Sequence, residues 1–236
     1  MTSHSHVLVV ADGDVDAREL VAIAGTSGHG QSGRPLVVAA DGGAAKCLSA
    51  GVQPDLVVGD FDSLAASERD RLQGLGVERR PADPDQDESD MELCLLAALE
   101  VGAERITILG ALGIDRPEHS IANLLLLADP RLDAAEVSLL GRASCITRIG
   151  THDGPGEIVI TGASGDFVSL FPLGASVDGV STEGLRFPLH AEVLSLGPSR
   201  GLSNELLGTT ARVRTRRGRL LVVHTTGDRS EGRTGA

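Results

Sequence analysis

Acidic residues follow two short apolar segments of the chain, in a pattern that suits a metal ion. The segment GDFDS, residues 59–63, places Asp60 and Asp62 at positions i and i+2, so both carboxylates point the same way on an extended backbone. Asp41 follows another apolar segment and precedes two glycines. Mg²⁺ takes few protein carboxylates and keeps positions free for substrate phosphates. These residues therefore predict a site for phosphoryl chemistry.

Two further groups could join that site. Asp83, Asp85, Asp87 and Asp90 form an acidic cluster at the start of an expected helix. Residues 116–119, with the sequence Arg-Pro-Glu-His, supply a cation and an imidazole just before another expected helix. An arginine beside clustered carboxylates would stabilise the charge of a transferring phosphoryl group. The chain has no GxxxxGK[ST] motif, so a P-loop enzyme is not expected.

Each of these groups also has an ordinary structural explanation. Residues 59–63 could form a solvated turn closed by an Asx hydrogen bond, and Asp41-Gly42-Gly43 a plain turn. The acids up to Asp90 could cap a helix and compensate its dipole, and a lone His119 is often structural. The functional interpretation therefore depends on whether the groups converge in the fold.

The expected secondary structure brings these groups to one edge of a sheet. Apolar, β-branched runs predict strands that are buried on both faces, as in a parallel sheet: Val7–Val10, Leu36–Ala40, Leu56–Val58 and Ile106–Leu109. Helices are expected over Gly43–Ala50, Asp90–Glu100 and Ser120–Ala128. The alternation predicts an α/β domain, whose loops after the strands gather at the edge where open sheets bind ligands.

The chain after about residue 150 has a different pattern. Short strand candidates separated by Gly, Pro and Ser predict an antiparallel β domain: Glu157–Thr161, Asp166–Phe171, Ala191–Leu196, Ala211–Thr215 and Leu220–His224. Residues 216–218 are expected to form a hairpin turn between the last two strands. We expect an α/β domain over residues 1–148, an all-β domain over 149–226 and a disordered tail over 227–236, with a mobile loop over 25–33.

Composition and charge exclude several classes of protein. The 236 residues are 41% hydrophobic and 23% charged, enough for a folded core. No apolar run approaches the roughly 20 residues that span a bilayer, and the N-terminus lacks the basic region of a signal peptide. A net charge of −12, with four Phe and no Tyr or Trp, disfavours a nucleic-acid partner, and the arginines of residues 212–219 are expected to be a solvated face. Three widely spaced cysteines argue against a disulfide framework or a zinc site and favour the cytoplasm.

Six motifs in order give the chain a family resemblance. They are residues 40–44 (ADGGA), 54–63 (PDLVVGDFDS), 86–90 (QDESD), 116–119 (RPEH) leading to Ala122-Asn123, 181–189 (STEGLRFPL) and 203–205 (SNE). With these motifs the chain resembles bacterial-type thiamine pyrophosphokinases over most of residues 7–224. The resemblance implies an α/β domain with a mainly parallel sheet, then a C-terminal β-sandwich, in a homodimer with its sites between subunits. It implies transfer of the diphosphate of ATP to thiamine with Mg²⁺, giving AMP and thiamine diphosphate.

The resemblance also implies roles for individual residues. The metal would be held by Asp41, Asp60, Asp62 and Asp90, and the catalytic residues would be Asp60, Asp62, Asp90 and Arg116. The ATP site would be formed by Asp41, Gly42, Gly43, Ser63, Gln86, Asp87, Ser89, Arg116, Glu118, His119 and Asn123. Thiamine would be bound by Ser181, Thr182, Glu183, Phe187, Ser203 and Asn204. The chain departs from the family pattern at Ile114 and at Glu118, which stands in place of the family's Asp.

Two other functions are compatible with the residues alone. One is diphosphate transfer to another hydroxymethyl compound, such as a pterin, which the same carboxylates would serve equally well. The other is a sensor that binds a nucleotide or thiamine without catalysis. The motifs at residues 181–189 and 203–205 favour thiamine over a pterin, and the number of carboxylates favours an enzyme over a sensor.

Overall fold

The structure is a computed structural model that describes residues 5–25, 33–83, 85–113 and 116–227. Most of the loop expected over residues 25–33, nearly all of the expected tail, and Ile114 lie outside the described residues. The chain divides into two units, Met1–Arg142 and Ala143–Ala236. The functional domains expected over residues 1–148 and 149–226 stay predictions.

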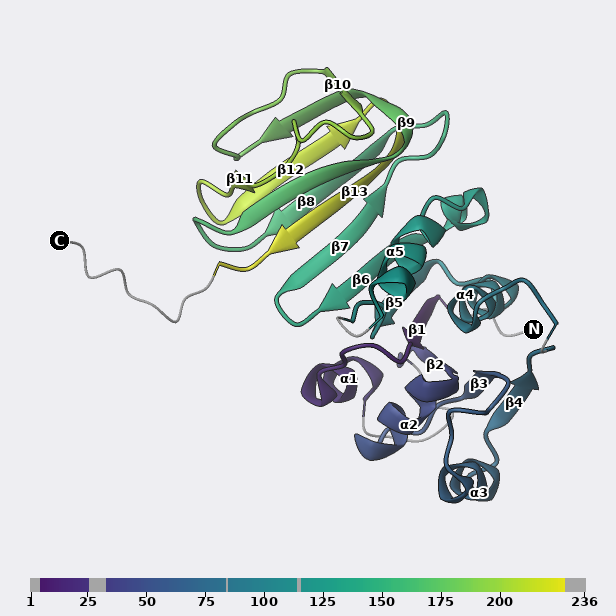
Figure 1. Ribbon diagram of the computed structural model, residues 1–236. Helices are drawn as coiled ribbons and strands as arrows, with labels where there is room; N and C mark the ends of the chain where they lie inside the picture. Colours follow the sequence, from purple (N-terminus) through teal and green to yellow (C-terminus); the bar gives the residue numbers. More distant parts are fainter. Residues whose placement is uncertain (1–4, 26–32, 84, 114–115, 228–236) are drawn as a thin grey trace. The chain divides into compact units, whose positions relative to one another are not determined.

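A parallel sheet forms the centre of the first unit (Figure 1). Its strands run in the order β4-β3-β2-β1-β5-β6, and each neighbouring pair is parallel. The strands are β1 (His6–Val10), β2 (Leu36–Ala40), β3 (Leu56–Gly59), β4 (Glu78–Pro81), β5 (Arg105–Leu109) and β6 (Glu136–Gly141). The four strands predicted from apolar runs are confirmed. Strands β2, β3 and β4 are added in turn on one side of β1, and β5 and β6 are added on its other side.

Helices connect these strands and cover the sheet. They are α1 (Ala17–Ala24), α2 (Asp41–Ser49), α3 (Ala66–Gly74), α4 (Asp90–Glu100) and α5 (Pro117–Leu126), followed by the 3₁₀ helix η1 (Pro130–Ala134). Alternate strand residues, such as Leu8 and Val57, pack in one cluster with Leu20 of α1, Cys47 of α2 and Leu72 of α3. The intervening strand residues point to the other face. Helix α4 contacts β1, β2 and β3 with residues outside that cluster, so it covers the opposite face.

The second unit consists of antiparallel strands, as predicted. They are β7 (Ser144–Ile149), β8 (Gly156–Thr161), β9 (Phe167–Glu183), β10 (Glu192–Ser195), β11 (Asn204–Glu205), β12 (Thr210–Thr215) and β13 (Arg217–Thr225). Strand β9 has 17 residues and is shared, because its first half pairs with β13 and its last residues pair with β12. Buried side chains from these strands, including Val168, Val180, Val213 and Leu220, form one apolar cluster.

The hairpin expected at residues 216–218 is wrong. Strand β12 pairs with β8 and β9, whereas β13 pairs with β7 and β9, so the two strands that this turn joins do not form a ladder with each other. Instead, β12 and the start of β13 pair with β9 in the same antiparallel register, with Arg214 opposite Ser181 and Arg217 opposite Asp178, so the chain continues along β9. Gly218, with a φ of 101°, lies where the register of β13 with β9 shifts, and other residues rarely adopt this conformation.

None of the helices in the described part of the chain combines the length and apolar character that crossing a membrane requires.

Candidate active site

Three of the predicted carboxylates lie at the carboxyl ends of two adjacent strands. Asp41 follows β2 and is the first residue of α2, and Asp60 and Asp62 follow β3. The register pairs Ala40 with Val58, so both strands end at the same edge of the sheet. One oxygen from each of Asp41, Asp60 and Asp62 lies within 4.8 Å of the others. The convergence expected from the sequence is therefore present for these three side chains.

The Asp41 carboxylate is buried, and only one of its two oxygens accepts a hydrogen bond. It is 2% exposed, and its Oδ2 accepts a hydrogen bond from the Ser63 N–H at 2.9 Å. Its Oδ1 has no hydrogen-bond partner among the described residues. Burial raises the pKa of Asp41, the Ser63 N–H lowers it, and the charges of Asp60 and Asp62 raise it further. A buried anion without a partner is costly, so this oxygen is suited to a positive ligand.

Asp90 adds a fourth carboxylate from the start of α4. A Cβ built on Gly59 would lie 2.9 Å from the Asp41 Cβ and 3.3 Å from both Asp90 oxygens, so Gly59 leaves the space in which these side chains meet. Gly59 has a φ of 144°, which disfavours a side chain independently of the space. Burial raises the pKa of Asp90 first, and the charges of Asp41, Asp60 and Asp62 raise it further.

These four residues fit a hard divalent cation. Their donor atoms are all carboxylate oxygens, which Mg²⁺ and Ca²⁺ prefer. Burial raises the pKa of Asp41 and of Asp90, and the charges of the neighbouring carboxylates raise both further, so the cluster is costly without a counter-ion.

The burial of Asp90 and the negative charges around it predict that Asp90→Asn stabilises the metal-free protein. Because the folded-state pKa of Asp90 is raised, its ionised form opposes folding above that pKa, and the free energy of unfolding should be higher in the variant at pH 7. The gain should shrink as the pH falls toward the ordinary Asp value, because wild-type Asp90 then becomes neutral. Urea unfolding with EDTA, followed by circular dichroism at pH 7 and pH 4, measures both effects. A lower stability of the variant at pH 7 would contradict this prediction.

The loop that carries Asp60 and Asp62 is internally bonded. The Asp62 N–H donates to Asp60 Oδ1 at 3.1 Å, which is the Asx bond of the ordinary structural explanation. The Ser63 hydroxyl donates to Asp62 Oδ1 at 3.1 Å. The turn and the carboxylate cluster thus coexist, because the turn holds the two acids in place and leaves their remaining oxygens available.

Glycines at the start of α2 serve close packing. A Cβ on Gly43 would lie 2.0 Å from the Val10 carbonyl oxygen, and one on Gly42 would lie 2.3 Å from the Asp12 Cγ. Helix α2 can therefore begin directly against the end of β1. Asp12 Oδ1 also lies 3.5 Å from the Lys46 Nζ, a pair that the sequence analysis did not predict.

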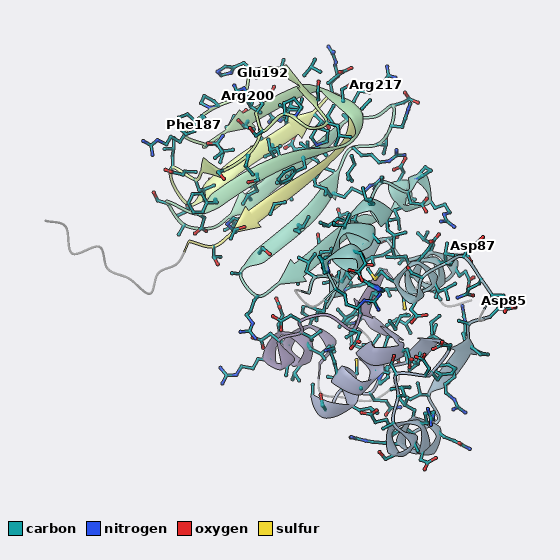
Figure 2. The ribbon with its side chains drawn as sticks, viewed as in Figure 1. Asp85, Asp87, Phe187, Glu192, Arg200 and Arg217 are labelled. Atoms are coloured by element: carbon teal, nitrogen blue, oxygen red, sulfur yellow. The ribbon has the colours of Figure 1, made fainter. Side chains whose placement is uncertain are left out.

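Asp41, Gly42, Gly43 and Ser63 of the predicted ATP site lie at the start of α2 and after β3, and the other residues predicted to bind ATP lie around the start of α4 and α5. Ser89 caps α4, since its hydroxyl accepts the Glu92 N–H at 3.3 Å. Gln86 closes the preceding loop, because its side chain bonds the Asp83 N–H and the Glu88 carbonyl, both at 3.3 Å. Asp87 is exposed at the same loop (Figure 2).

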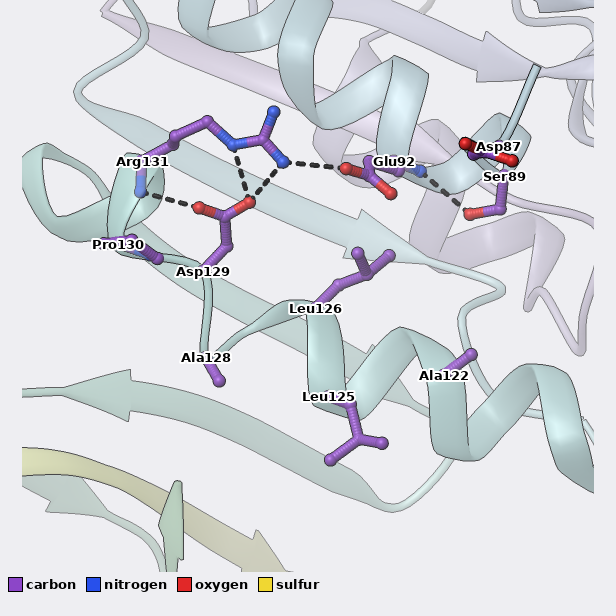
Figure 3. Close-up of a pocket in the computed structure, with 10 residues that line it drawn as sticks. All are labelled: Asp87, Ser89, Glu92, Ala122, Leu125, Leu126, Ala128, Asp129, Pro130 and Arg131. Carbon is purple, nitrogen blue, oxygen red and sulfur yellow. Dashed lines mark hydrogen bonds and ion pairs between the residues drawn. The ribbon is translucent and has the colours of Figure 1, made fainter. Parts of the chain in front are cut away.

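A groove beside this loop contains residues that sequence reasoning missed. Asp87 and Ser89 line it together with Glu92, Ala122, Leu125, Leu126, Ala128, Asp129, Pro130 and Arg131 (Figure 3). Arg131 links α4 to the segment after α5, with ion pairs to Glu92 at 2.7 Å and to Asp129 at 2.5 Å (Figure 3). The Asp-Pro-Arg sequence is a recognisable helix start, but only the fold places it opposite α4.

The basic group before α5 is exposed. Arg116 Nε donates to Glu118 at 2.8 Å, and His119 lies 4.0 Å from the same carboxylate. Asn123 has a different position, because it is buried and its Nδ2 donates to the Ala111 carbonyl at 2.8 Å. Asn123 therefore anchors the loop after β5, whereas the other three are accessible to a ligand.

In the second unit, the predicted thiamine residues organise one loop. The Thr182 hydroxyl accepts the Leu189 N–H at 2.9 Å, and the Ser181 hydroxyl accepts the Ala191 N–H at 2.9 Å. These two bonds hold both strands at the base of the loop of residues 184–191. Phe187 is 55% exposed near the loop's outer end (Figure 2).

Asn204 fixes the backbone that carries Phe187. Its Oδ1 accepts the Phe187 N–H at 2.9 Å and its Nδ2 donates to the Phe187 carbonyl at 2.7 Å. Asn204 itself is 9% exposed, so the structure uses its amide internally. Its neighbour Ser203 has a φ of 56°, and its N–H donates to the Ser169 hydroxyl at 3.0 Å.

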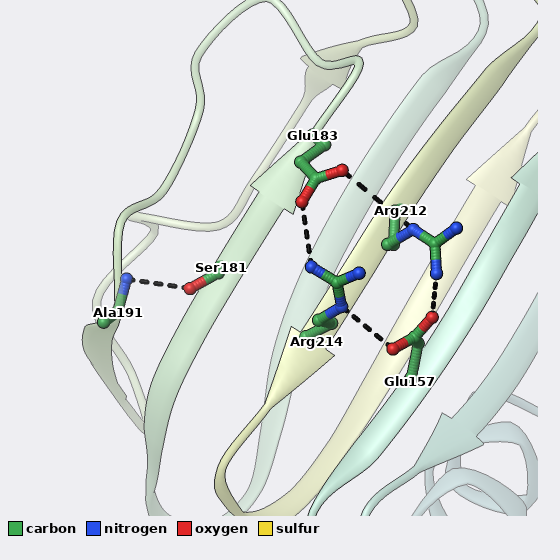
Figure 4. A network of polar contacts seen from close by, with 6 residues as sticks. All are labelled: Glu157, Ser181, Glu183, Ala191, Arg212 and Arg214. Carbon is green, nitrogen blue, oxygen red and sulfur yellow. Dashed lines mark hydrogen bonds and ion pairs between the residues drawn. The ribbon is translucent and has the colours of Figure 1, made fainter.

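Glu183 belongs to a network of charges across the strands β8, β12 and β9 (Figure 4). Arg214 pairs with Glu183 and with Glu157, both at 2.9 Å, and Arg212 contacts the same two acids. The arginines are thus neutralised by acids, as the solvated-face interpretation expects, and offer little free positive charge to a phosphate backbone.

Two family models match the chain. The model described as "Thiamin pyrophosphokinase, catalytic domain" matches residues 30–139, which include the carboxylate cluster. The model described as "Thiamin pyrophosphokinase, vitamin B1 binding domain" matches residues 157–220, which include Phe187 and Asn204. Together the two models cover well over half of the chain.

Individual relatives agree with these matches. Thiamine pyrophosphokinase of Bacillus subtilis (strain 168) is 27% identical over 192 residues, which is 81% of this chain and 87% of the relative. The crystal structure of the Bacillus subtilis thiamine pyrophosphokinase has a TM-score of 0.78 at 24% identity and covers 94% of this chain and 99% of its own. Thiamin pyrophosphokinase from Candida albicans has a TM-score of 0.73 at 16% identity, covering 94% of this chain and 89% of its own, which shows the shared fold. The chain belongs to the thiamin pyrophosphokinase family.

Proposed function

We propose that this protein is a thiamine diphosphokinase, which transfers the β,γ-diphosphate of ATP to the hydroxyl of thiamine and releases AMP. The observation that carries the proposal is the cluster of Asp41, Asp60, Asp62 and Asp90 in the region that matches the family's catalytic domain. The match of residues 157–220 to the vitamin B1 binding domain supports thiamine as the acceptor.

The carboxylate cluster would hold the metal ion, which we propose is Mg²⁺. Asp41, Asp60, Asp62 and Asp90 are its proposed ligands, and the unpaired buried oxygen of Asp41 supports this assignment. When bound, the ion would supply positive charge that neutralises the phosphates of ATP. The chain's own contribution is to fix the carboxylates before the substrates arrive, since Ser63 and the Asx turn already hold Asp41, Asp60 and Asp62.

The reaction exchanges one bond to the β-phosphorus for another. The thiamine hydroxyl oxygen forms a bond to that phosphorus, the bond to the oxygen between the α- and β-phosphates breaks, and AMP leaves with that oxygen. The hydroxyl proton passes to a carboxylate, for which Asp62 and Asp90 are the candidates. Positioning and charge neutralisation carry most of the rate in phosphoryl transfer.

The exposed groups at the start of α4 and α5 are the proposed contacts of ATP. Arg116 and His119 are accessible cations or donors for phosphate oxygens, and Asp87 and Ser89 line the adjacent groove. Glu118 bonds Arg116, so we propose that it orients the guanidinium. Asn123 and Gln86 would act by holding the loops, since both use their amides internally.

The loop around Phe187 is the proposed thiamine contact. Its exposed ring offers a flat apolar surface to an aromatic vitamin, and the chain's net charge of −12 suits a cationic thiazolium. Thr182, Ser181 and Asn204 would support the loop rather than the ligand. We further propose that the second unit is a two-layer sandwich. We also propose that the enzyme is a homodimer, and the molar mass measured by light scattering of the purified protein would test this.

Product analysis tests the proposed function. Purified protein is incubated with thiamine, ATP and Mg²⁺, and the nucleotides and thiamine esters are separated by chromatography. We expect AMP and thiamine diphosphate in equal amounts. ADP with thiamine monophosphate would refute attack on the β-phosphorus. Thiamine binding without turnover would favour a sensor, and turnover with a hydroxymethyl pterin alone would favour the alternative acceptor.

A further inference from the structure

The loop between β3 and α3 has a costly backbone conformation between two proposed metal ligands. Phe61, which separates Asp60 from Asp62, has a φ of 64°. A bulky residue rarely adopts this left-handed region, so the surrounding structure must hold it there. The Phe61 ring packs partly against the apolar core of the first unit, which fixes the side chain but leaves the peptide planes of the loop free to turn.

Arg69 holds those peptide planes. Its Nη1 donates to the Phe61 carbonyl at 3.0 Å and to the Leu64 carbonyl at 2.7 Å. Arg69 lies on α3, and the two carbonyls it binds lie on either side of Asp62 and Ser63. Hydrogen bonds from a charged donor are stronger than neutral ones, so a half-buried guanidinium is a firm clamp on the loop.

The hydrogen bonds of Arg69 affect the carboxylates through the backbone of the loop. The Phe61 carbonyl belongs to the same peptide group as the Asp62 N–H, which bonds Asp60 Oδ1. The adjacent Ser63 N–H, inside the clamped segment, bonds Asp41 Oδ2. A rotation of the Phe61–Asp62 peptide plane would break the bond to Asp60, and a rotation of the Asp62–Ser63 peptide plane would break the bond to Asp41. Either rotation would separate the three carboxylates.

We propose that Arg69 is a positioning residue for the cation site, which it preorganises by fixing the backbone on both sides of Asp62. The consequence for catalysis rests on the proposed function. The effect of Arg69 on the positions of the carboxylates does not depend on the substrate. Arg69 touches neither the metal nor the substrates in this scheme and acts through the loop.

The test compares Arg69→Gln with Arg71→Gln. Both variants remove one positive charge from α3, but Arg71 donates to the Leu48 carbonyl at 3.2 Å and does not bind the loop. Mn²⁺ serves as the probe, and its free concentration is measured by electron paramagnetic resonance in the absence of ATP and thiamine. We expect the Mn²⁺ affinity to fall about tenfold or more in R69Q and to change less than twofold in R71Q, because loss of a group that orients metal ligands costs about 10–100-fold in affinity.

A steady-state measurement adds a readout that general damage would not give. In R69Q the Mg²⁺ concentration for half-maximal rate should rise by a similar factor, while kcat at saturating Mg²⁺ stays within about threefold of wild type. Circular dichroism verifies the fold. If R69Q does not fold, Arg69→Lys takes its place, because a lysine keeps the charge but is too short to bind both carbonyls and should weaken Mn²⁺ binding severalfold.

The outcomes separate this inference from the proposed function. Equal Mn²⁺ affinity in R69Q and R71Q, or wild-type affinity in R69K when only that variant folds, would overturn the positioning role. Weak Mn²⁺ binding by R69Q would support it even if the wild type produced no thiamine diphosphate. In that case the proposed function would fail while the role of Arg69 in the cation site would stand.

Discussion

Asp60→Asn should lower the rate of thiamine diphosphate formation by about a thousandfold while the protein keeps its fold. A metal ion contributes several kcal/mol of charge stabilisation in the transition state, and each 1.36 kcal/mol is tenfold in rate. Asp60 is an exposed member of the cluster whose oxygens lie within 4.8 Å of one another. Its removal therefore weakens the metal site without leaving a hole in the core.

Chromatography of the reaction products measures this effect, and Asp70→Asn is the matched control. Asp70 is an exposed aspartate on α3, so the control removes the same charge from the same region outside the cluster. We expect turnover of D70N within about twofold of wild type, since surface substitutions away from special features have small effects. Near-normal turnover by D60N would refute the assignment of Asp60 as a metal ligand.

The largest effect on stability is expected for Asp166, in the second unit. Asp166 is 1% exposed, and it accepts hydrogen bonds from the Ala163 N–H at 2.9 Å, the Gly227 N–H at 3.0 Å and the His224 Nε2 at 3.0 Å. One carboxylate thus ties the start of β9 to the end of β13. Asp166→Ala removes all three bonds and leaves partly buried donors unpaired, which should cost about 3 kcal/mol of unfolding free energy.

The pH dependence identifies the ionised carboxylate as the source of that stability. Burial raises the pKa of Asp166, but the amides of Gly227 and Ala163 and the His224 imidazole outweigh it and lower the pKa to about 2. A depressed pKa means that the stabilisation is complete above the ordinary Asp value and is lost as the pH falls toward 2. Between pH 4 and pH 2 the wild type should therefore lose about 2 kcal/mol more than D166A.

Urea unfolding followed by far-ultraviolet circular dichroism measures both quantities, because the chain has no Trp or Tyr to report by fluorescence. Asp153→Asn is the control, since Asp153 pairs with His152 at 3.0 Å on the surface and such pairs contribute little. A D166A protein as stable as D153N would show that the three bonds contribute nothing beyond their exchange with water.

The sequence predicted the elements whose residues are buried and locally consistent. The run Leu36–Ala40 is the strand β2, and Asp90–Glu100 is the helix α4, both with the expected bounds. The strand β4, with the sequence ERRP, was not predicted because it is an exposed edge strand with charges and a proline instead of apolar residues. The helix α3 was not predicted either, because a single buried leucine gives its sequence almost no apolar periodicity.

The candidate site was predictable to the extent that strand ends determine it. Asp41, Asp60 and Asp62 follow buried parallel strands, so their convergence could be expected from topology alone. The second β-rich half gave less information, since β9 continues far beyond the predicted Asp166–Phe171 through Gly174, which interrupts the alternation. Arg69 had no signal in the sequence, because its two bonds join a helix side chain to loop carbonyls and exist only after α3 has packed.

The position of β13 in its sheet sets an order for folding during synthesis. Strand β13 is the last strand in the described part of the chain, yet it lies between β7 and β9 and pairs with both. The neighbours β7 and β9 therefore cannot complete their hydrogen bonding until residues 217–225 have left the ribosome. The first unit, whose strands all precede residue 142, can fold as soon as it emerges. While the ribosome synthesises the last part of the chain, the open edges of β7 and β9 are the segments of the nascent protein most exposed to wrong pairing with other chains.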